Sequence, residues 1–214
     1  MRKLVLKMSI SADGFVGGQN GELDWLFKTM DKSALDWIER TLWEAGVHIM
    51  GRRTYHDMAN YWPTSSDTLA APMNEIPKIV FSKKGIIEPA NIELTTQALK
   101  DATQKDTESG ISASTLSKSA STWTNVPVAS DIVSKIAELK QQEGKFILAH
   151  GGASFAQDLV KHDLIDEFRL LIHPVILGKG LPLFAMAQKQ IDLKLISSTP
   201  LSTGIIANIY NREK

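Results

Sequence analysis

The chain has 214 residues, and its 24 Lys and Arg balance 24 Asp and Glu, so the formal net charge at pH 7 is zero. A balanced charge gives no global attraction for nucleic acid or an anionic membrane surface, and we expect no nucleic acid partner. Without cysteine the chain holds neither a disulfide nor a thiolate metal site, and its five histidines lack metal-ligand spacing, so no metal is expected.

The length favours one domain spanning residues 1–214, because a chain of this size buries well over half of its unfolded surface in a single core. The apolar run at the N-terminus ends at Lys7, which is too short for the central region of a signal peptide. No later run approaches the roughly 18 apolar residues that a membrane span needs. We therefore expect a cytoplasmic protein with no membrane partner.

The first part of the chain alternates between apolar runs and glycine-rich breaks. Residues 3–10 predict a central strand, and the glycines that follow predict a loop over residues 13–22 that is mobile unless a ligand orders it. Apolar residues at steps of three or four predict a helix over residues 33–45. Residues 47–50 then predict a short buried strand that runs directly into Gly51 and a second, short helix.

Residues 79–81 and 92–94 predict two more short strands, after which the composition changes. Residues 103–122 are polar, rich in Ser and Thr and without a sustained period, which indicates a long surface excursion or a disordered segment. Its composition is compatible with a spacer without function and with a contact for a partner. Residues 126–129 are again predicted to be structured, and they precede a predicted helix over residues 131–142.

A short buried strand at residues 146–149 breaks at Gly151 and Gly152, and Phe155 then begins an apolar pattern with helical spacing. Two glycines between a strand and a helix let a pyrophosphate approach the backbone, where free N–H groups and the positive end of the helix dipole face the anion. Such turns also carry glycine for purely steric reasons. This junction alone therefore leaves both interpretations open.

Residues 168–177 predict a further strand, and residues 193–198 and 204–211 predict a closing hairpin. Strands that alternate with helices predict an α/β fold with an open, mostly parallel sheet that is covered by helices on both faces. The C-terminal antiparallel hairpin makes this sheet mixed.

Five short motifs occur along the chain in a fixed order: Ser-Ala-Asp-Gly at 11–14, Gly-Arg-Arg-Thr-Tyr at 51–55, Trp-Thr-Asn at 123–125, Gly-Gly-Ala at 151–153 and Gly-Leu-Pro-Leu-Phe at 180–184. Together they resemble the dihydrofolate reductase superfamily, in the branch similar to the C-terminal reductase domain of bacterial riboflavin biosynthesis proteins. The resemblance covers nearly the whole chain. It implies a dihydrofolate reductase-like fold and an NADPH-dependent oxidoreductase that transfers a hydride to a small heterocyclic substrate.

Ligands bind an open α/β sheet beyond the carboxyl ends of its strands, and the resemblance gives residues at those ends a role. It implies that NADPH is bound by Gly51, Arg52, Thr54, Ser82, Lys83, Gly151, Gly152 and Ser154. Arg52, Lys83 and Lys84 follow two strand ends that the family brings to the adenosine 2′-phosphate, which favours NADPH over NADH. The alternative for Arg52 and Lys83 is a solvated charge on the surface.

The candidate residues on the substrate side follow from the same resemblance. Asp13 ends the first strand and is the candidate catalytic residue, which orients the substrate or the nicotinamide amide; the alternative is an aspartate that stabilises a turn. The candidates for substrate contact are Trp25, Trp123 and Leu181. Each tryptophan either stacks on a planar heterocycle or belongs to the core.

One departure from dihydrofolate reductases bears on the substrate. Those enzymes carry a carboxylate on the first helix, but Ala34 stands at that place here, and Asp36 lies about 200° further round the helix. We therefore predict a reductase that resembles 5-amino-6-(5-phosphoribosylamino)uracil reductase of riboflavin biosynthesis. The alternatives are a dihydrofolate reductase and a non-catalytic nucleotide-binding module.

The resemblance also bears on assembly. Small members of the family commonly pair, and the apolar turn at residues 181–184 would expose hydrophobic surface in a monomer. We therefore expect a homodimer whose ligands are NADPH and a small heterocycle.

Overall fold

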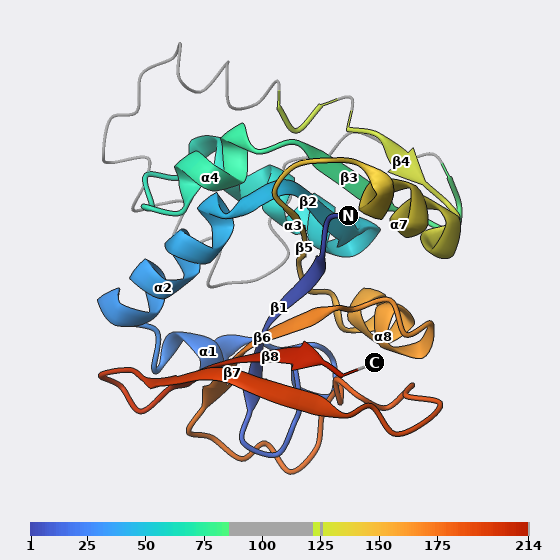
Figure 1. Ribbon diagram of the computed structural model, residues 1–214. Helices are drawn as coiled ribbons and strands as arrows, with labels where there is room; N and C mark the ends of the chain where they lie inside the picture. Colours follow the sequence, from blue (N-terminus) through green and yellow to red (C-terminus); the bar gives the residue numbers. More distant parts are fainter. Residues whose placement is uncertain (86–121, 125, 214) are drawn as a thin grey trace.

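The computed structural model describes residues 1–85, 122–124 and 126–213, and its strands form one eight-stranded sheet (Figure 1). The strands are β1 (Leu4–Ser11), β2 (Ala45–Gly51), β3 (Lys78–Phe81), β4 (Val128–Ala129), β5 (Phe146–Ala149), β6 (Glu167–His173), β7 (Leu193–Pro200) and β8 (Ile206–Arg212). Their order across the sheet is β4-β3-β2-β5-β1-β6-β8-β7. The pairings from β4 to β6 are parallel, and β8 pairs antiparallel with both β6 and β7. The predicted mixed sheet with a C-terminal hairpin is confirmed.

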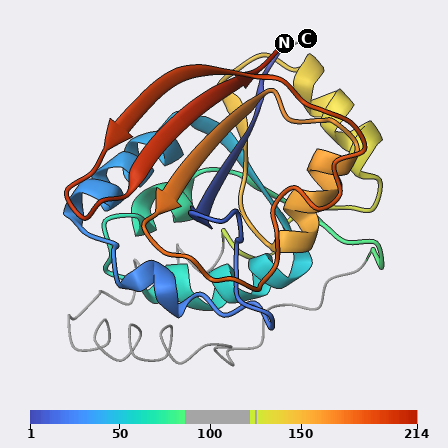
Figure 2. The same ribbon diagram turned by 90° about the horizontal axis from the view of Figure 1, so that it is seen from below.

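Helices cover both faces of this sheet. In the described part of the chain they are α1 (Asp24–Phe27), α2 (Lys32–Trp43), α3 (Arg52–Tyr61), the 3₁₀ turn η1 (Trp62–Thr64), α4 (Ala70–Glu75), α7 (Ile132–Gln141) and α8 (Ala153–Lys161). Side chains alternate between the faces of a strand, so Leu4 and Leu6 of β1 pack with α7 and α8, whereas Val5 packs with α2 and α4. In Figure 2 the yellow and orange helices α7 and α8 lie on one side of the strands and the blue helix α2 on the other.

Several elements end earlier than the apolar pattern predicts. Strand β6 ends at His173 and not at residue 177, because Pro174 has no N–H to continue the ladder; the N–H of Val175 donates to the carbonyl of His173 over 2.8 Å. Helix α2 ends at Trp43 because β2 already begins at Ala45. The short helices α1 and α4 are not predicted by the sequence pattern. The predicted strand at residues 92–94 and nearly all of the polar stretch 103–122 lie outside the described residues.

The glycine-rich loop after β1 is held in place by the chain itself. The N–H of Val16 donates to the carbonyl of Leu181, and the N–H of Leu181 donates back to the carbonyl of Gly17, over 2.8 and 2.9 Å. The N–H of Leu183 also donates to the carbonyl of Gly14 over 3.1 Å. Backbone hydrogen bonds to residues 181–183 therefore hold this loop in the structure, and its mobility in the absence of a ligand stays a prediction.

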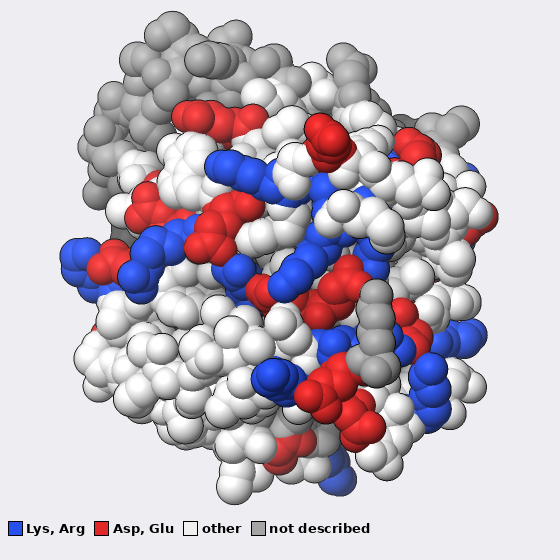
Figure 3. Space-filling model, viewed as in Figure 1, with Lys and Arg blue, Asp and Glu red and all other residues white. Residues whose placement is uncertain are grey.

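Charges of both signs are mixed on the face of the molecule that Figure 3 shows, where blue and red side chains lie side by side across the middle and at the lower right, and the lower left is mostly white. This distribution agrees with a chain whose 24 basic and 24 acidic residues cancel. Within the described ranges, no helix combines the length and the apolar character needed to span a bilayer.

Candidate functional site

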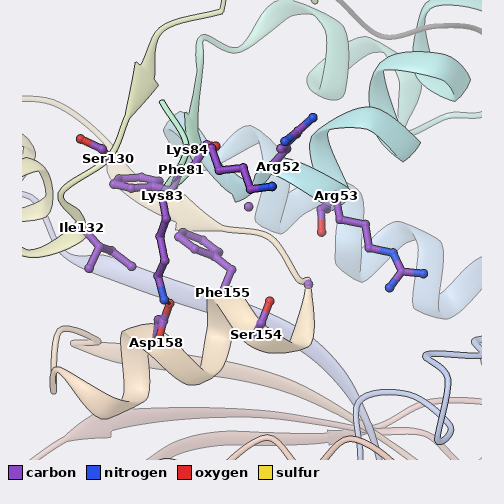
Figure 4. A pocket seen from close by; sticks show the side chains of 14 residues that line it. Arg52, Arg53, Phe81, Lys83, Lys84, Ser130, Ile132, Ser154, Phe155 and Asp158 are labelled. Carbon is purple, nitrogen blue, oxygen red and sulfur yellow. The ribbon is translucent and has the colours of Figure 1, made fainter. Parts of the chain in front are cut away.

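A cleft of about 340 Å³ opens at the carboxyl ends of four neighbouring strands, β4, β3, β2 and β5. Its described lining comprises Gly51, Arg52, Arg53 and Thr54 after β2; Phe81, Ser82, Lys83 and Lys84 at the end of β3; Ser130 and Ile132 after β4; and Gly152, Ser154, Phe155 and Asp158 after β5 (Figure 4). Parallel strands end at the same edge of a sheet, which is why segments far apart in the sequence meet here.

The two strand–glycine–helix junctions are in direct contact at the cleft. The hydroxyl of Thr54 donates to the carbonyl of Gly151 over 2.7 Å. Gly152 has a φ of 97°, and a Cβ there would lie 2.6 Å from that same hydroxyl oxygen. At Gly51 a Cβ would lie 3.1 Å from the Cβ of Phe155 on α8. Close packing of the two junctions thus accounts for glycine at these positions.

The two helices that begin at these junctions carry no side-chain cap. The first residues before α3 and α8 are Gly51 and Gly152, and neither can offer a side chain to the free N–H groups of the first turn. The other two described helices of comparable length are capped by aspartates, because Asp31 accepts from the N–H of Ala34, and Asp131 caps α7 in the same way. The N–H groups at the starts of α3 and α8 are therefore available to an anion in the cleft.

Basic side chains occupy the end of α3 where a helix dipole disfavours them. Arg52 and Arg53 are its first two residues, at the positive end of the dipole, where an acidic residue would be stabilising. The guanidinium of Arg52 lies along the helix, with Nε 3.4 Å from Nε2 of His56. Burial and then the charge of Arg52 lower the pKa of His56 below its ordinary value. An anion bound at this helix start would relieve the unfavourable arrangement.

The cleft brings together most of the residues predicted to bind the cofactor. Seven of the eight line it, namely Gly51, Arg52, Thr54, Ser82, Lys83, Gly152 and Ser154. Gly151 is not part of the lining, since it packs under the cleft: a Cβ there would lie 3.1 Å from Sδ of Met8 on β1. Their contact with a cofactor stays a prediction.

Asp13 braces two loops at the end of β1. Its Oδ1 accepts from the hydroxyl of Ser11 over 2.6 Å and from the N–H of Leu177 over 3.2 Å, and its Oδ2 accepts from the N–H of Gly178 over 2.7 Å. The hydroxyl of Ser11, followed by the two N–H groups, lowers the pKa of this carboxyl group. The structure thus supports the turn-stabilising alternative for Asp13, and a catalytic role stays a prediction.

The two tryptophans predicted to contact substrate are buried. Trp123 is 3% exposed, and its ring N–H donates to Oδ1 of Asn74 over 2.7 Å, so neither its face nor its edge is open to a ligand in this structure. Trp25 is 8% exposed and packs edge-on against His173, with ring centroids 5.2 Å apart. Both side chains therefore lie in the core of this structure, and their contact with a substrate stays a prediction. Leu181 is half-buried and holds the glycine-rich loop through its backbone.

Three polar residues of the cleft are absent from the predicted set: Arg53, Ser130 and Asp158. Ser130 directly follows β4, so the rule that ligand sites lie beyond strand ends also points to it. Asp158 lies four residues after Ser154, and residues at this spacing share one face of a helix. In the part of the chain that the structure describes, no group of three or more His, Asp or Glu side chains could hold a metal ion.

Comparisons with known proteins agree with this architecture. The uncharacterized protein YyaP of Bacillus subtilis is 28% identical over 211 residues, which are 98% of this chain and 95% of that protein. A putative riboflavin biosynthesis protein from Shewanella sp. PV-4 has a similar structure, with a TM-score of 0.69, 22% identity and complete coverage of both chains. Dihydrofolate reductase from Enterococcus faecalis, solved with NADP(H), is similar with a TM-score of 0.59, 12% identity and coverage of 99% of this chain and 97% of its own. The predicted dihydrofolate reductase-like fold is confirmed.

The family assignment rests on a match that covers nearly the whole chain, including both glycine junctions. The model of the RibD C-terminal domain matches residues 2–207, and so includes β1, both junctions of the cleft and the start of β8. The chain is a member of the RibD C-terminal domain family.

Proposed function

We propose that the protein is a reductase that binds NADPH in the cleft and transfers its hydride to a small heterocyclic substrate. The observation that carries this proposal is the pair of uncapped helix starts, α3 and α8, in one cleft with Arg52 and Arg53. Free N–H groups and the positive ends of two helix dipoles suit a pyrophosphate, which carries two negative charges between its nucleosides. Membership of the RibD C-terminal domain family supports the same conclusion.

The cations of the cleft support the phosphorylated cofactor over NADH. Arg52 follows β2, and Lys83 and Lys84 follow the neighbouring strand β3, so their side chains enter the cleft from two adjacent strand ends. The 2′-phosphate of NADPH adds about two negative charges, by analogy with other phosphate monoesters, and arginine can bind it with paired N–H donors. When bound, the nicotinamide supplies the hydride, and the protein supplies binding and orientation.

The first long helix supports a substrate other than folate. Ala34 is fully buried against the sheet and offers no carboxylate. Asp36 faces solvent, as predicted, and its Oδ2 lies 2.7 Å from Nζ of Lys32. Asp31 is occupied by the cap of α2 and by the hydroxyl groups of Ser33 and Ser202. Because no acid of this helix start is free for a pterin, we favour a phosphoribosylamino-pyrimidine or a related heterocycle as substrate.

Turnover of defined substrates tests this proposal. With NADPH as reductant, we expect oxidation of NADPH in the presence of 5-amino-6-(5-phosphoribosylamino)uracil, and weak or absent oxidation with dihydrofolate. The measurement is the loss of NADPH absorbance, with each substrate omitted in turn as a control. Robust turnover of dihydrofolate would contradict the substrate assignment. Binding of NADPH without turnover of any heterocycle in a wider screen would instead favour the alternative of a non-catalytic nucleotide-binding module.

The homodimer and the cytoplasmic location stay predictions. The apolar turn at residues 181–184 gives weaker support for a dimer than its sequence indicates, because Leu183 is fully buried and Leu181 is half-buried, which leaves only Pro182 and Phe184 exposed. Larger apolar exposure lies on the edge strand β7, where Leu195 and Ile196 are each 51% exposed. A dimer that covers β7 would therefore bury more apolar surface than one centred on that turn.

A further inference from the structure

An ion pair crosses the cleft between the end of β3 and the middle of α8. The Nζ of Lys83 lies 3.1 Å from Oδ2 of Asp158. Figure 4 shows the Lys83 side chain extending past Phe81 and Phe155 to reach that carboxylate. The lysine proposed to meet the cofactor's 2′-phosphate is therefore already paired within the protein.

Asp158 stands out by its charge. Among the described residues that line the cleft, it is the one carboxylate beside four cations, Arg52, Arg53, Lys83 and Lys84. A cleft built only to attract phosphate gains nothing from an acid on its wall, because a carboxylate repels the phosphate and neutralises a cation that would bind it. The ion pair thus reduces the charge that the cleft presents to an incoming phosphate.

We propose that Asp158 competes with the 2′-phosphate of the cofactor for Lys83, and so sets how strongly the protein prefers NADPH over NADH. This inference rests on the proposed function. NADPH must separate the two side chains before Lys83 can bind its phosphate, whereas NADH carries a hydroxyl group there and leaves the pair intact. The acid therefore weakens NADPH binding selectively.

The exposure of the pair allows this exchange. The side chain of Lys83 is 84% exposed and that of Asp158 is 28% exposed, so solvent screens their attraction and the pair opens readily. A phosphate with about two charges is a stronger partner for an ammonium group than a carboxylate with one. Lys83 is thus expected to move from Asp158 to the 2′-phosphate, at a cost in affinity that Asp158 imposes.

The variant Asp158→Asn tests the proposal, because it keeps the shape of the side chain and removes its charge. We expect the dissociation constant for NADPH to fall about two- to tenfold, and that for NADH to change less than about twofold. Isothermal titration calorimetry of both cofactors measures the two constants. Glu138→Gln is the matched control, since it removes one negative charge from the ion pair with Lys135 on α7, outside the cleft, and should leave both constants unchanged.

A second variant separates competition for Lys83 from simple repulsion of the phosphate. In a Lys83→Met background no cation is left to release, so Asp158→Asn should improve NADPH binding by less than it does in the wild type. An equal improvement in both backgrounds would overturn the competition, and so would an Asp158→Asn variant whose preference for NADPH is unchanged. If the wild-type protein binds neither cofactor, the proposed function itself fails, which is a different outcome from these two.

Discussion

Replacing Arg52 by alanine is expected to weaken NADPH binding by about ten- to a thousandfold and NADH binding far less, because charge-assisted hydrogen bonds contribute roughly 1.5 to 3 kcal/mol each before desolvation of the cation is deducted. Arg52 is the first residue of α3, between the uncapped helix start and His56. Its guanidinium can turn from His56 to the 2′-phosphate of NADPH, whereas NADH carries only a hydroxyl group at that position. Calorimetric titration of both cofactors into the variant measures the change in preference.

The matched control for Arg52 is Arg40→Ala on α2. Arg40 is exposed, its Nε donates to the carbonyl of Asp36 on its own helix over 3.2 Å, and it is not among the residues that line the cleft. This control should leave both dissociation constants at their wild-type values. If Arg52→Ala weakens NADPH and NADH equally, Arg52 does not bind the 2′-phosphate and is a surface charge of the helix start.

Acidification between pH 6.5 and 5.5 is expected to lower the free energy of unfolding by about 3 kcal/mol, because three buried histidines each contribute about 1 kcal/mol to the difference over this range. His48 and His173 are fully buried and His150 is 2% exposed. Burial, followed by the charge of Lys78, lowers the pKa of His48 to about 3. Burial lowers the pKa of His173 to about 4, and burial followed by His48 holds the pKa of His150 well below its ordinary value.

The sign of this effect follows from the protons that each state binds. Above pH 6.5 these histidines are neutral in the folded and the unfolded chain, and the stability is fully present. Below pH 6.5 the unfolded chain takes up protons that the folded protein cannot accept until the pH approaches the lowered values, so stability is lost as the pH falls. Carboxyl groups with a lowered pKa, such as that of Asp131, also cause the free energy of unfolding to fall as the pH falls, but only at a lower pH than the histidines.

Urea unfolding at the two pH values, followed by tryptophan fluorescence, measures this loss. His48→Leu should reduce the difference by about 1 kcal/mol, since one of the three contributing groups is removed. An unfolding free energy that is the same at pH 6.5 and pH 5.5 would show that these histidines are protonated in the folded protein.

The position of the cleft is predictable from the sequence because it depends on local signals. Each of its segments directly follows an apolar run, and a single rule, that parallel strands end at one edge of the sheet, places Gly51, Ser82 and Gly152 in the same cleft. The helical spacing of four residues from Ser154 also points to Asp158 on α8, but the predicted set does not include Asp158. The fold follows from the same alternation of strands and helices.

Other features depend on contacts between distant residues and leave no local signal. From the sequence Trp123 is either a ligand contact or part of the core, and its burial and its hydrogen bond to Asn74, 49 positions away, place it in the core of this structure. From the sequence Asp13 is either catalytic or turn-stabilising, and the hydrogen bonds from the N–H groups of Leu177 and Gly178 support the turn-stabilising role. Strand β6 ends at His173, before Pro174, for a reason visible in the sequence, but the apolar residues beyond Pro174 extend the pattern and hide the boundary.

A crystal structure of the protein in complex with NADPH most directly tests whether the cofactor binds in the cleft, because it shows the position of the cofactor and not only its affinity. We expect the pyrophosphate at the starts of α3 and α8, within about 3 Å of their free N–H groups, and the 2′-phosphate beside Arg52 and Ser82. We also expect that Lys83 has left Asp158. NADPH bound elsewhere on the sheet, or absent from the cleft at a saturating concentration, would contradict the proposed cofactor site.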